Sequence, residues 1–130
     1  MADSSAPSAA GSEPEAGDPE LMRQVIADYP EVTFVLAHGG RGRWYADAAE
    51  LALAGDNVWL DLAGLPPKRL PGYYAGFDLP RLARKWIFGT DWPGVPGVAR
   101  NARAITDLGL PGDVLAGVLS GNAAQVYLRD

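Results

Sequence analysis

Polar side chains that could do chemistry stand at the ends of three apolar runs in this sequence. His38 follows the run 32–37, Asp61 lies within the run 58–62, and Asp91 comes shortly after the run 86–88. An imidazole and one or two carboxylates on the same rim of a fold can bind a divalent metal, or can activate a water molecule by general base catalysis. Nothing local in the sequence brings residues 38 and 91 together, so this chemistry depends on the elements that position them.

The three apolar runs predict strands of a parallel sheet. They lack the polar alternation of a half-exposed strand, which is typical of strands that helices cover on both faces. Their starts are separated by about 26 to 28 residues, close to the roughly 30-residue period of a βα unit. Helices are predicted for residues 18–29, 44–54, 79–84, 98–108, 111–119 and 122–128, with a loop and one weak helical turn over 65–78. The pattern predicts an α/β fold with ligands beyond the carboxyl ends of the strands, and it fits a doubly wound sheet as well as a (β/α)₈ barrel.

Each polar residue at a strand end also has a structural interpretation. A lone histidine such as His38 can simply hydrogen-bond to the backbone, and Asp91 can be a turn or cap residue. Asp61 can pair with Lys68 or Arg69, or face the solvated end of a barrel. The sequence alone leaves these alternatives open.

Two arginines occupy the Gly-rich stretch 39–43. Arg41 and Arg43 could hold a substrate carboxylate by bidentate hydrogen bonds, but a solvated loop is the favoured interpretation. The glycines match neither a G-x-G-x-x-G nor a Walker pattern, so the sequence gives nucleotide binding no support.

Composition narrows the class of protein. The 130 residues include one histidine and no cysteine, and their formal net charge is −5. Residues 1–19 are mostly Ala, Ser, Gly, Pro and acids, which predicts a disordered acidic leader before a single domain over 20–130. No stretch concentrates Lys and Arg, which argues against nucleic acid as a partner. No apolar run approaches the roughly 18 residues of a membrane span, and the amino terminus does not have the pattern of a signal peptide, so we expect a soluble, cytoplasmic protein with no membrane partner.

Four short motifs occur in order along residues 20–130: VLAHGG at 35–40, NVWLDLAG at 57–64, IFGTDWP at 87–93 and GNAA at 121–124. Together they resemble the carboxyl-terminal part of the amidohydrolase-related proteins, the metal-dependent TIM-barrel hydrolases and decarboxylases. The resemblance implies that the three strands are about the sixth to eighth of a (β/α)₈ barrel that is incomplete in this chain. A whole barrel of this kind needs roughly 250 residues.

The resemblance also implies roles for single residues. His38 would bind or activate a metal-bound water, Asp91 would be a metal ligand and proton shuttle, and Asn122 would cap the last helix rather than act in catalysis. The metal is expected to be divalent, with zinc favoured. In the family, a His-x-His pair at the first strand and a histidine at the fifth also hold the metal, and His38 is this chain's single histidine. The ligand set is therefore incomplete, because a catalytic zinc ordinarily takes three protein ligands.

Three functions are compatible with these motifs. The favoured one is a metal-dependent hydrolase of an amide, lactone or similar bond in a small-molecule substrate. It would use a metal-activated water and depend on a second chain for the missing half of the barrel; a homo-oligomer is the alternative assembly. A metal-dependent decarboxylase of the same fold is the alternative, although Trp92 in place of a tyrosine inclines the motif to hydrolysis. A catalytically inactive remnant or interaction module, pairing its open sheet with a partner, is the third.

Overall fold

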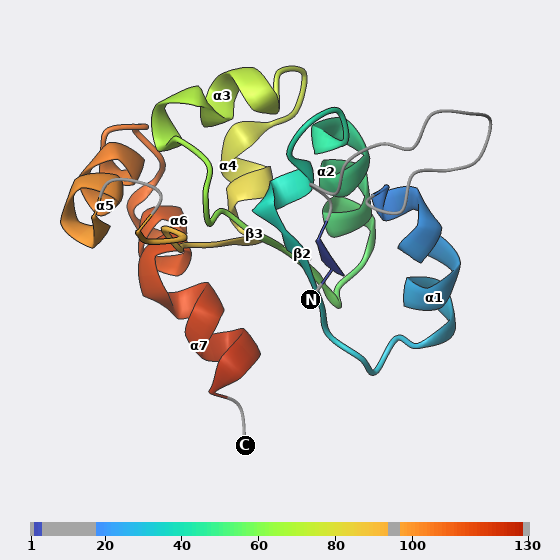
Figure 1. Cartoon of the computed structure of the whole chain (residues 1–130). Coiled ribbons are helices and arrows are strands. Elements are labelled where there is room, and N and C mark those ends of the chain that lie inside the picture. Colours follow the sequence, from blue (N-terminus) through green and yellow to red (C-terminus); the bar gives the residue numbers. More distant parts are fainter. Residues whose placement is uncertain (1, 4–17, 94–96, 129–130) are drawn as a thin grey trace.

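A computed structural model of the chain describes residues 2–3, 18–93 and 97–128 (Figure 1). One sheet contains four parallel strands in chain order: β1 (Ala2–Asp3), β2 (Phe34–Ala37), β3 (Val58–Asp61) and β4 (Trp86–Ile87). The helices are α1 (Arg23–Asp28), α2 (Tyr45–Ala54), α3 (Leu70–Tyr73), α4 (Leu79–Ala83), α5 (Val98–Thr106), α6 (Gly112–Ala116) and α7 (Asn122–Tyr127). In the described part of the chain, no helix has the length and apolar character needed to cross a membrane.

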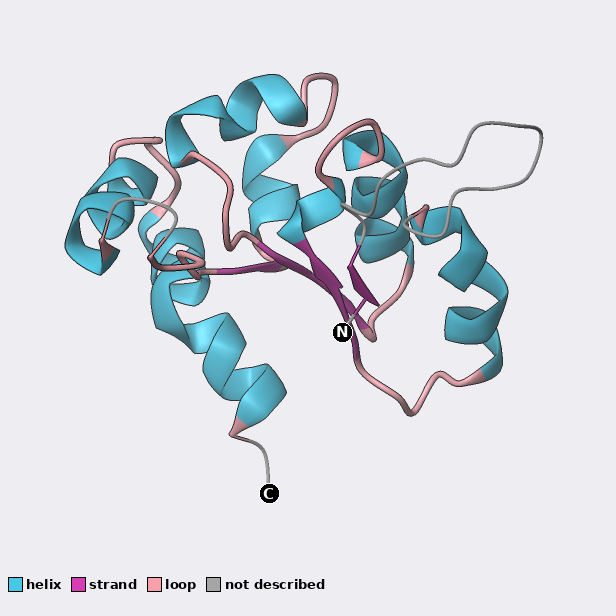
Figure 2. Cartoon of the chain, viewed as in Figure 1, coloured by secondary structure: helices cyan, strands magenta, loops and turns pink. Residues whose placement is uncertain are grey.

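The predicted alternation of strands and helices is confirmed. α2 connects β2 to β3, and α4 precedes β4, so each connection between these parallel strands contains a helix (Figure 2). Leu36 of β2 lies opposite Leu60 of β3, which lies opposite Trp86 of β4. Because this register aligns the strands, the loops that follow them leave the sheet at the same edge.

Two apolar layers sandwich the sheet. Leu36, Leu60 and Trp86 are fully buried on one face, in the main core that α2 and α4 complete. Trp59 and Ile87 point to the opposite face and pack with Val126 of α7 in a smaller cluster. Side chains alternate between the two faces of a strand, so both faces require apolar residues, which explains the unbroken apolar runs.

The amino-terminal part begins as the sequence predicts. Asp18 caps a 3₁₀ turn (Pro19–Met22), since its side chain accepts a hydrogen bond of 2.9 Å from the Glu20 N–H, and the turn leads directly into α1. Strand β1 lies within the expected disordered leader and pairs with β2. Residues 4–17 of that leader lie outside the described residues, so its disorder stays a prediction.

The carboxyl-terminal helices differ from the prediction of separate helices over 111–119 and 122–128. A π-helical turn (Gly117–Gly121) joins α6 to α7, and the backbone stays helical at Gly121 (φ −61°) and Asn122 (φ −66°). The wider π turn accommodates the Ser-Gly-Asn sequence without a break. Asn122 is therefore inside a continuous helix, and the prediction that it is a cap is wrong.

Candidate functional site

His38 directly follows β2 and has a fixed ring orientation. Its Nδ1 atom lies 2.6 Å from the Ala63 carbonyl oxygen in the loop after β3. A carbonyl oxygen only accepts hydrogen bonds, so Nδ1 carries the proton and donates it. In the neutral ring, Nε2 is then left with its lone pair, free to act as a base or as a metal ligand.

The glycines after His38 are required by close packing. A Cβ on Gly39 would overlap the Tyr74 hydroxyl oxygen, and a Cβ on Gly40 would come within 2.8 Å of the Ala48 Cβ in α2. The buried Tyr74 hydroxyl donates a 2.6 Å hydrogen bond to the Gly39 carbonyl oxygen. Burial raises the pKa of Tyr74, so its hydroxyl keeps the proton that it donates. The His-Gly-Gly turn is thus fixed from both sides, by Tyr74 and by α2.

Asp91 extends from the loop after β4, and its side chain is exposed. The Thr90 hydroxyl oxygen accepts a 3.2 Å hydrogen bond from the Trp92 N–H, and the Thr90 carbonyl accepts one of 3.3 Å from the Gly64 N–H. The first bond is within the Asp91 loop, and the second holds this loop against the loop after β3. Asp91 therefore lies beside the loop whose carbonyl oxygen orients His38.

The side chains of His38, Asp91 and Arg41 converge on Gly64. A Cβ placed on Gly64 would lie 3.3 Å from His38 Nδ1, 3.3 Å from Asp91 Oδ2 and 3.0 Å from Arg41 Nη1. Gly64 has φ +81°, a conformation that favours glycine, and its missing side chain leaves the space that these three groups surround. The tertiary structure thus brings together the two predicted site residues, 53 positions apart in the sequence.

His38 and Asp91 share an unusual backbone conformation. Within the described ranges they are the two non-glycine residues with positive φ, at +56° and +62°. Non-glycine residues pay roughly 1 kcal/mol or more for this region, and such residues cluster at functional sites. Positive φ thus occurs at the same two non-glycine positions that the sequence motifs indicate.

Arg41 is a residue whose place the sequence did not predict. The favoured interpretation was a solvated loop, but Arg41 is partly buried and reaches the point where His38 and Asp91 meet. Arg43 is exposed, and its guanidinium lies 5.7 Å from the centre of the Trp44 ring. The two arginines therefore differ, although nothing in the Gly-Arg-Gly-Arg sequence distinguishes them.

Asp61 stabilises the loop that orients His38. Its Oδ1 atom accepts a 2.8 Å hydrogen bond from the Ala63 N–H, two residues later in the same loop. The Ala63 carbonyl is the group that holds His38, so Asp61 shapes the loop that orients the imidazole. This oxygen does not bind Lys68 or Arg69, the partners considered from the sequence, because the nearby Ala63 N–H already bonds to it in a local turn.

Asn122 anchors the strand that leads to Asp91. Its Nδ2 atom donates a 2.7 Å hydrogen bond to the Trp86 carbonyl oxygen in β4. The N–H of Phe88, which follows β4, donates to the Val118 carbonyl in the π turn at 3.1 Å. These two bonds fix the end of β4 against the last helical segment.

The described residues do not complete a metal site by themselves. Among them, no group of three or more His, Cys, Asp and Glu side chains is placed to hold a metal ion. Arg41 Nη1 also lies beside His38 Nδ1 and Asp91 Oδ2 at Gly64, so a cation held by His38 Nε2 would have to lie away from this point. A catalytic metal would therefore need ligands from outside the described residues.

Comparisons with known proteins bear on the family and the fold of the chain. The family model described as Amidohydrolase matches residues 9–129. Among solved structures, the chain is similar to an uncharacterized TIM-barrel protein, Bb4693, from Bordetella bronchiseptica, with a TM-score of 0.70 and 26% sequence identity. The match covers 85% of this chain and 39% of that protein. No curated protein matches the chain.

The comparison confirms the predicted architecture. A parallel sheet with helical connections, similar to part of a TIM barrel and spanning 39% of its length, is an incomplete (β/α)₈ barrel. The family match extends over almost the whole sequence and includes all four motifs. The chain belongs to the amidohydrolase family.

Proposed function

We propose that this chain supplies the carboxyl-terminal catalytic residues of a metal-dependent hydrolase that cleaves an amide, lactone or similar bond in a small molecule. The observation that carries the proposal is the convergence of His38 and Asp91 on Gly64, both with positive φ. Family membership supports the same general chemistry. A cytoplasmic location remains part of the proposal.

The side chains have complementary roles in this proposal. His38 donates through Nδ1 to Ala63, so its Nε2 atom exchanges a proton with the substrate or the attacking water. The exposed Asp91 carboxylate accepts a proton from that water. Arg41, which reaches the same point, offers a bidentate partner for a carboxylate or a developing oxyanion of the substrate.

A divalent metal, with zinc favoured, would activate the water as a nucleophile near pH 7. His38 Nε2 and the Asp91 carboxylate are the groups of this chain that would hold it, and the remaining ligands would come from the rest of the barrel. We propose that a second polypeptide provides that part. The match covers 39% of the TIM-barrel neighbour, so the other ligands of a similar barrel would come from outside the matched part.

The experiment compares the chain alone with the chain co-expressed with the polypeptide encoded immediately upstream. We expect retained zinc, measured by elemental analysis, and hydrolysis of a panel of amides and lactones with both polypeptides only. Asp91→Asn should lower kcat at least 100-fold, whereas Asp56→Asn, at an exposed aspartate elsewhere, should leave the rate unchanged. Hydrolysis that survives Asp91→Asn would rule out the proposed role of Asp91, and release of CO₂ from an aromatic acid would indicate the decarboxylase instead.

An inactive interaction module is the second candidate, favoured by the incomplete donor set and by apolar side chains left exposed around α1. Leu21 is 48% exposed, Val25 40% and Val32 41%. Such a module would bind no metal and would associate through this flank. A metal-free chain that elutes as a dimer or larger species, without activity in any mixture, would support it.

A further inference from the structure

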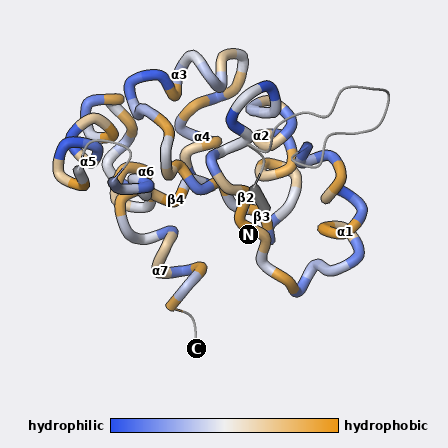
Figure 3. The backbone as a smooth tube through the Cα atoms, viewed as in Figure 1, coloured by the Kyte–Doolittle hydropathy of each residue, from blue (hydrophilic) through white to orange (hydrophobic). Residues whose placement is uncertain are grey.

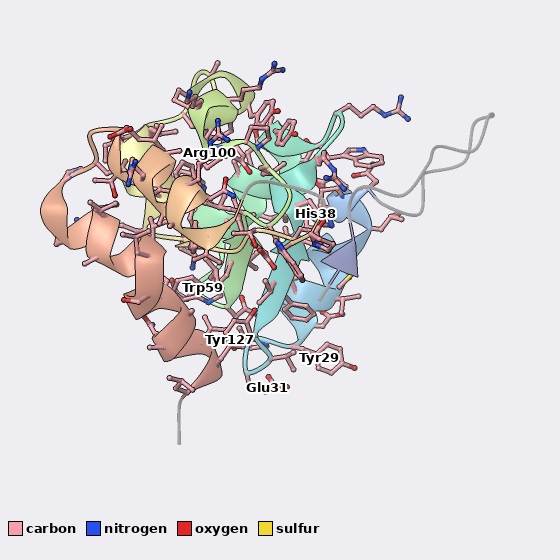
Figure 4. The ribbon with its side chains drawn as sticks, turned by 60° about the vertical axis from the view of Figure 1, so that its left-hand side comes forward. Tyr29, Glu31, His38, Trp59, Arg100 and Tyr127 are labelled. Carbon is pink, nitrogen blue, oxygen red and sulfur yellow. The ribbon has the colours of Figure 1, made fainter. Side chains whose placement is uncertain are left out.

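A cavity separate from the His38 and Asp91 centre lies between the 3₁₀ turn Pro67–Arg69 and helix α5. Its volume is about 440 Å³, within the range of pockets that hold small molecules. Figure 4 shows Arg100, on its α5 wall, toward the same end of the fold as His38 and away from Tyr29, Glu31 and Tyr127. Arg100 therefore lies toward the end of the fold at which His38 follows β2.

Positive charge dominates the walls of this cavity. Lys68 and Arg69 come from the turn, Arg100 and Arg103 come from α5, and Asp107 is the single carboxylate among the described residues that line the cavity. The acidic partners found within residues 18–93 and 97–128 belong to Arg23 and Arg84 instead. Figure 3 shows the turn before α3 and much of α5 as hydrophilic. All four of these residues are exposed, so water screens their mutual repulsion, and an anion placed between them is attracted by each of them.

The positions of the arginines on α5 are consistent with a shared binding surface. Arg100 and Arg103 are three residues apart, and Ala104 and Asp107 follow at the spacing that keeps all four on one face of a helix. That face lines the cavity. Opposite it, Pro66 and Pro67 fix the backbone of the turn, so the wall is preorganised.

The floor of the cavity is apolar. Leu65 and Pro67 are buried at its base, and Ala104 adds a methyl group from α5. A bare inorganic anion would leave this surface unused, whereas a compact ring would cover it. We propose that the cavity binds a small organic dianion, with an apolar body on this floor and two anionic groups held by the lysine and arginines. The proposal does not depend on the hydrolase function, because residues of this chain alone line the cavity.

Isothermal titration of the full chain with isophthalate tests the proposal. We expect saturable binding of isophthalate, none of its neutral dimethyl ester, and binding several-fold weaker when the ionic strength rises from about 0.05 M to about 0.3 M. Binding of the ester as tight as that of the dianion would overturn the proposal, as would the absence of saturable binding. A second titration uses inorganic phosphate, which has no apolar body. If phosphate binds as tightly as isophthalate, the apolar floor does not contribute to binding and that part of the proposal is wrong.

Four variants locate the site. Arg100→Gln and Arg103→Gln should each weaken isophthalate binding at least fivefold, whereas Arg81→Gln, at an exposed arginine of α4 outside the cavity, should not change it. Asp107→Asn removes the opposing charge and should tighten binding several-fold, an effect that general loss of structure cannot produce. Equal affinities in all four variants would place the anion elsewhere and overturn the proposal. Circular dichroism confirms that each variant is folded.

Discussion

The Tyr74→Phe substitution tests how the His-Gly-Gly turn is held. It removes one oxygen atom and leaves the ring, which packs edge-on to Tyr45 and lies 5.8 Å from the Trp86 ring. What is lost is the 2.6 Å hydrogen bond to the carbonyl of the buried residue Gly39. An unpaired buried acceptor of this kind costs about 1–2 kcal/mol. For a domain of this size, that corresponds to a decrease of roughly 4–10 °C in melting temperature.

Urea and thermal unfolding, followed by circular dichroism, measure this change. Tyr29→Phe is the matched control, because Tyr29 is 52% exposed and its hydroxyl is in solvent, so its stability should stay within about 0.5 kcal/mol of the wild type. If Tyr74→Phe is as stable as Tyr29→Phe, the Tyr74 hydroxyl does not hold the turn, and our account of the His38 loop is wrong.

The pH dependence of the same comparison has a defined sign. Burial raises the pKa of Tyr74 in the folded protein above the value of about 10 in the unfolded chain. The stabilisation by its neutral hydroxyl is therefore present in full below about pH 10. Above that pH the unfolded wild type ionises, so its advantage over Tyr74→Phe should shrink. A constant difference through pH 11 would contradict the burial of this hydroxyl.

Two further substitutions follow from the same contacts. Gly39→Ala should cost more than about 2 kcal/mol of unfolding free energy because its Cβ overlaps the Tyr74 hydroxyl, whereas Gly42→Ala, at a positive φ in open space, should cost about 1 kcal/mol. The Gly39→Ala cost should fall in a Tyr74→Phe background, and strict additivity would refute the overlap. Asn122→Ala should lower the free energy of unfolding by about 1–2 kcal/mol, because it leaves the Trp86 carbonyl without its hydrogen bond. Urea unfolding measures this loss, with Gln125→Ala at an exposed position of the same helix as the control. Equal losses in the two variants would contradict the anchoring role of Asn122.

Much of the fold could be predicted because local patterns decide it. Three kinds of signal act within a few residues: the Asp18 cap, the apolar runs of β2, β3 and β4, and the glycines that follow these strands. The predictions failed where contacts with other elements decide the local structure. Asn122 looks like a cap after Ser120-Gly121, but a π turn and the Trp86 carbonyl keep it inside a helix.

The candidate site shows the same division. The sequence indicated His38 and Asp91 as polar residues at strand ends, and the parallel register places their loops side by side. It could not separate Arg41 from Arg43, because their local sequences are alike and the difference is which one reaches Gly64. It also left the partner of Asp61 open, with Lys68 and Arg69 among the alternatives, whereas the nearby Ala63 N–H binds its Oδ1 atom.

By itself, the sequence indicated candidate residues for chemistry and the elements that present them, because residue type and hydrophobic period are properties of the chain. Only the tertiary structure decided how those residues meet. It gave His38 its tautomer through Ala63, brought Arg41 to the same point as Asp91, and formed a basic cavity between α5 and the turn before α3. Each of these depends on a contact between residues distant in sequence, which the sheet register and helix packing create.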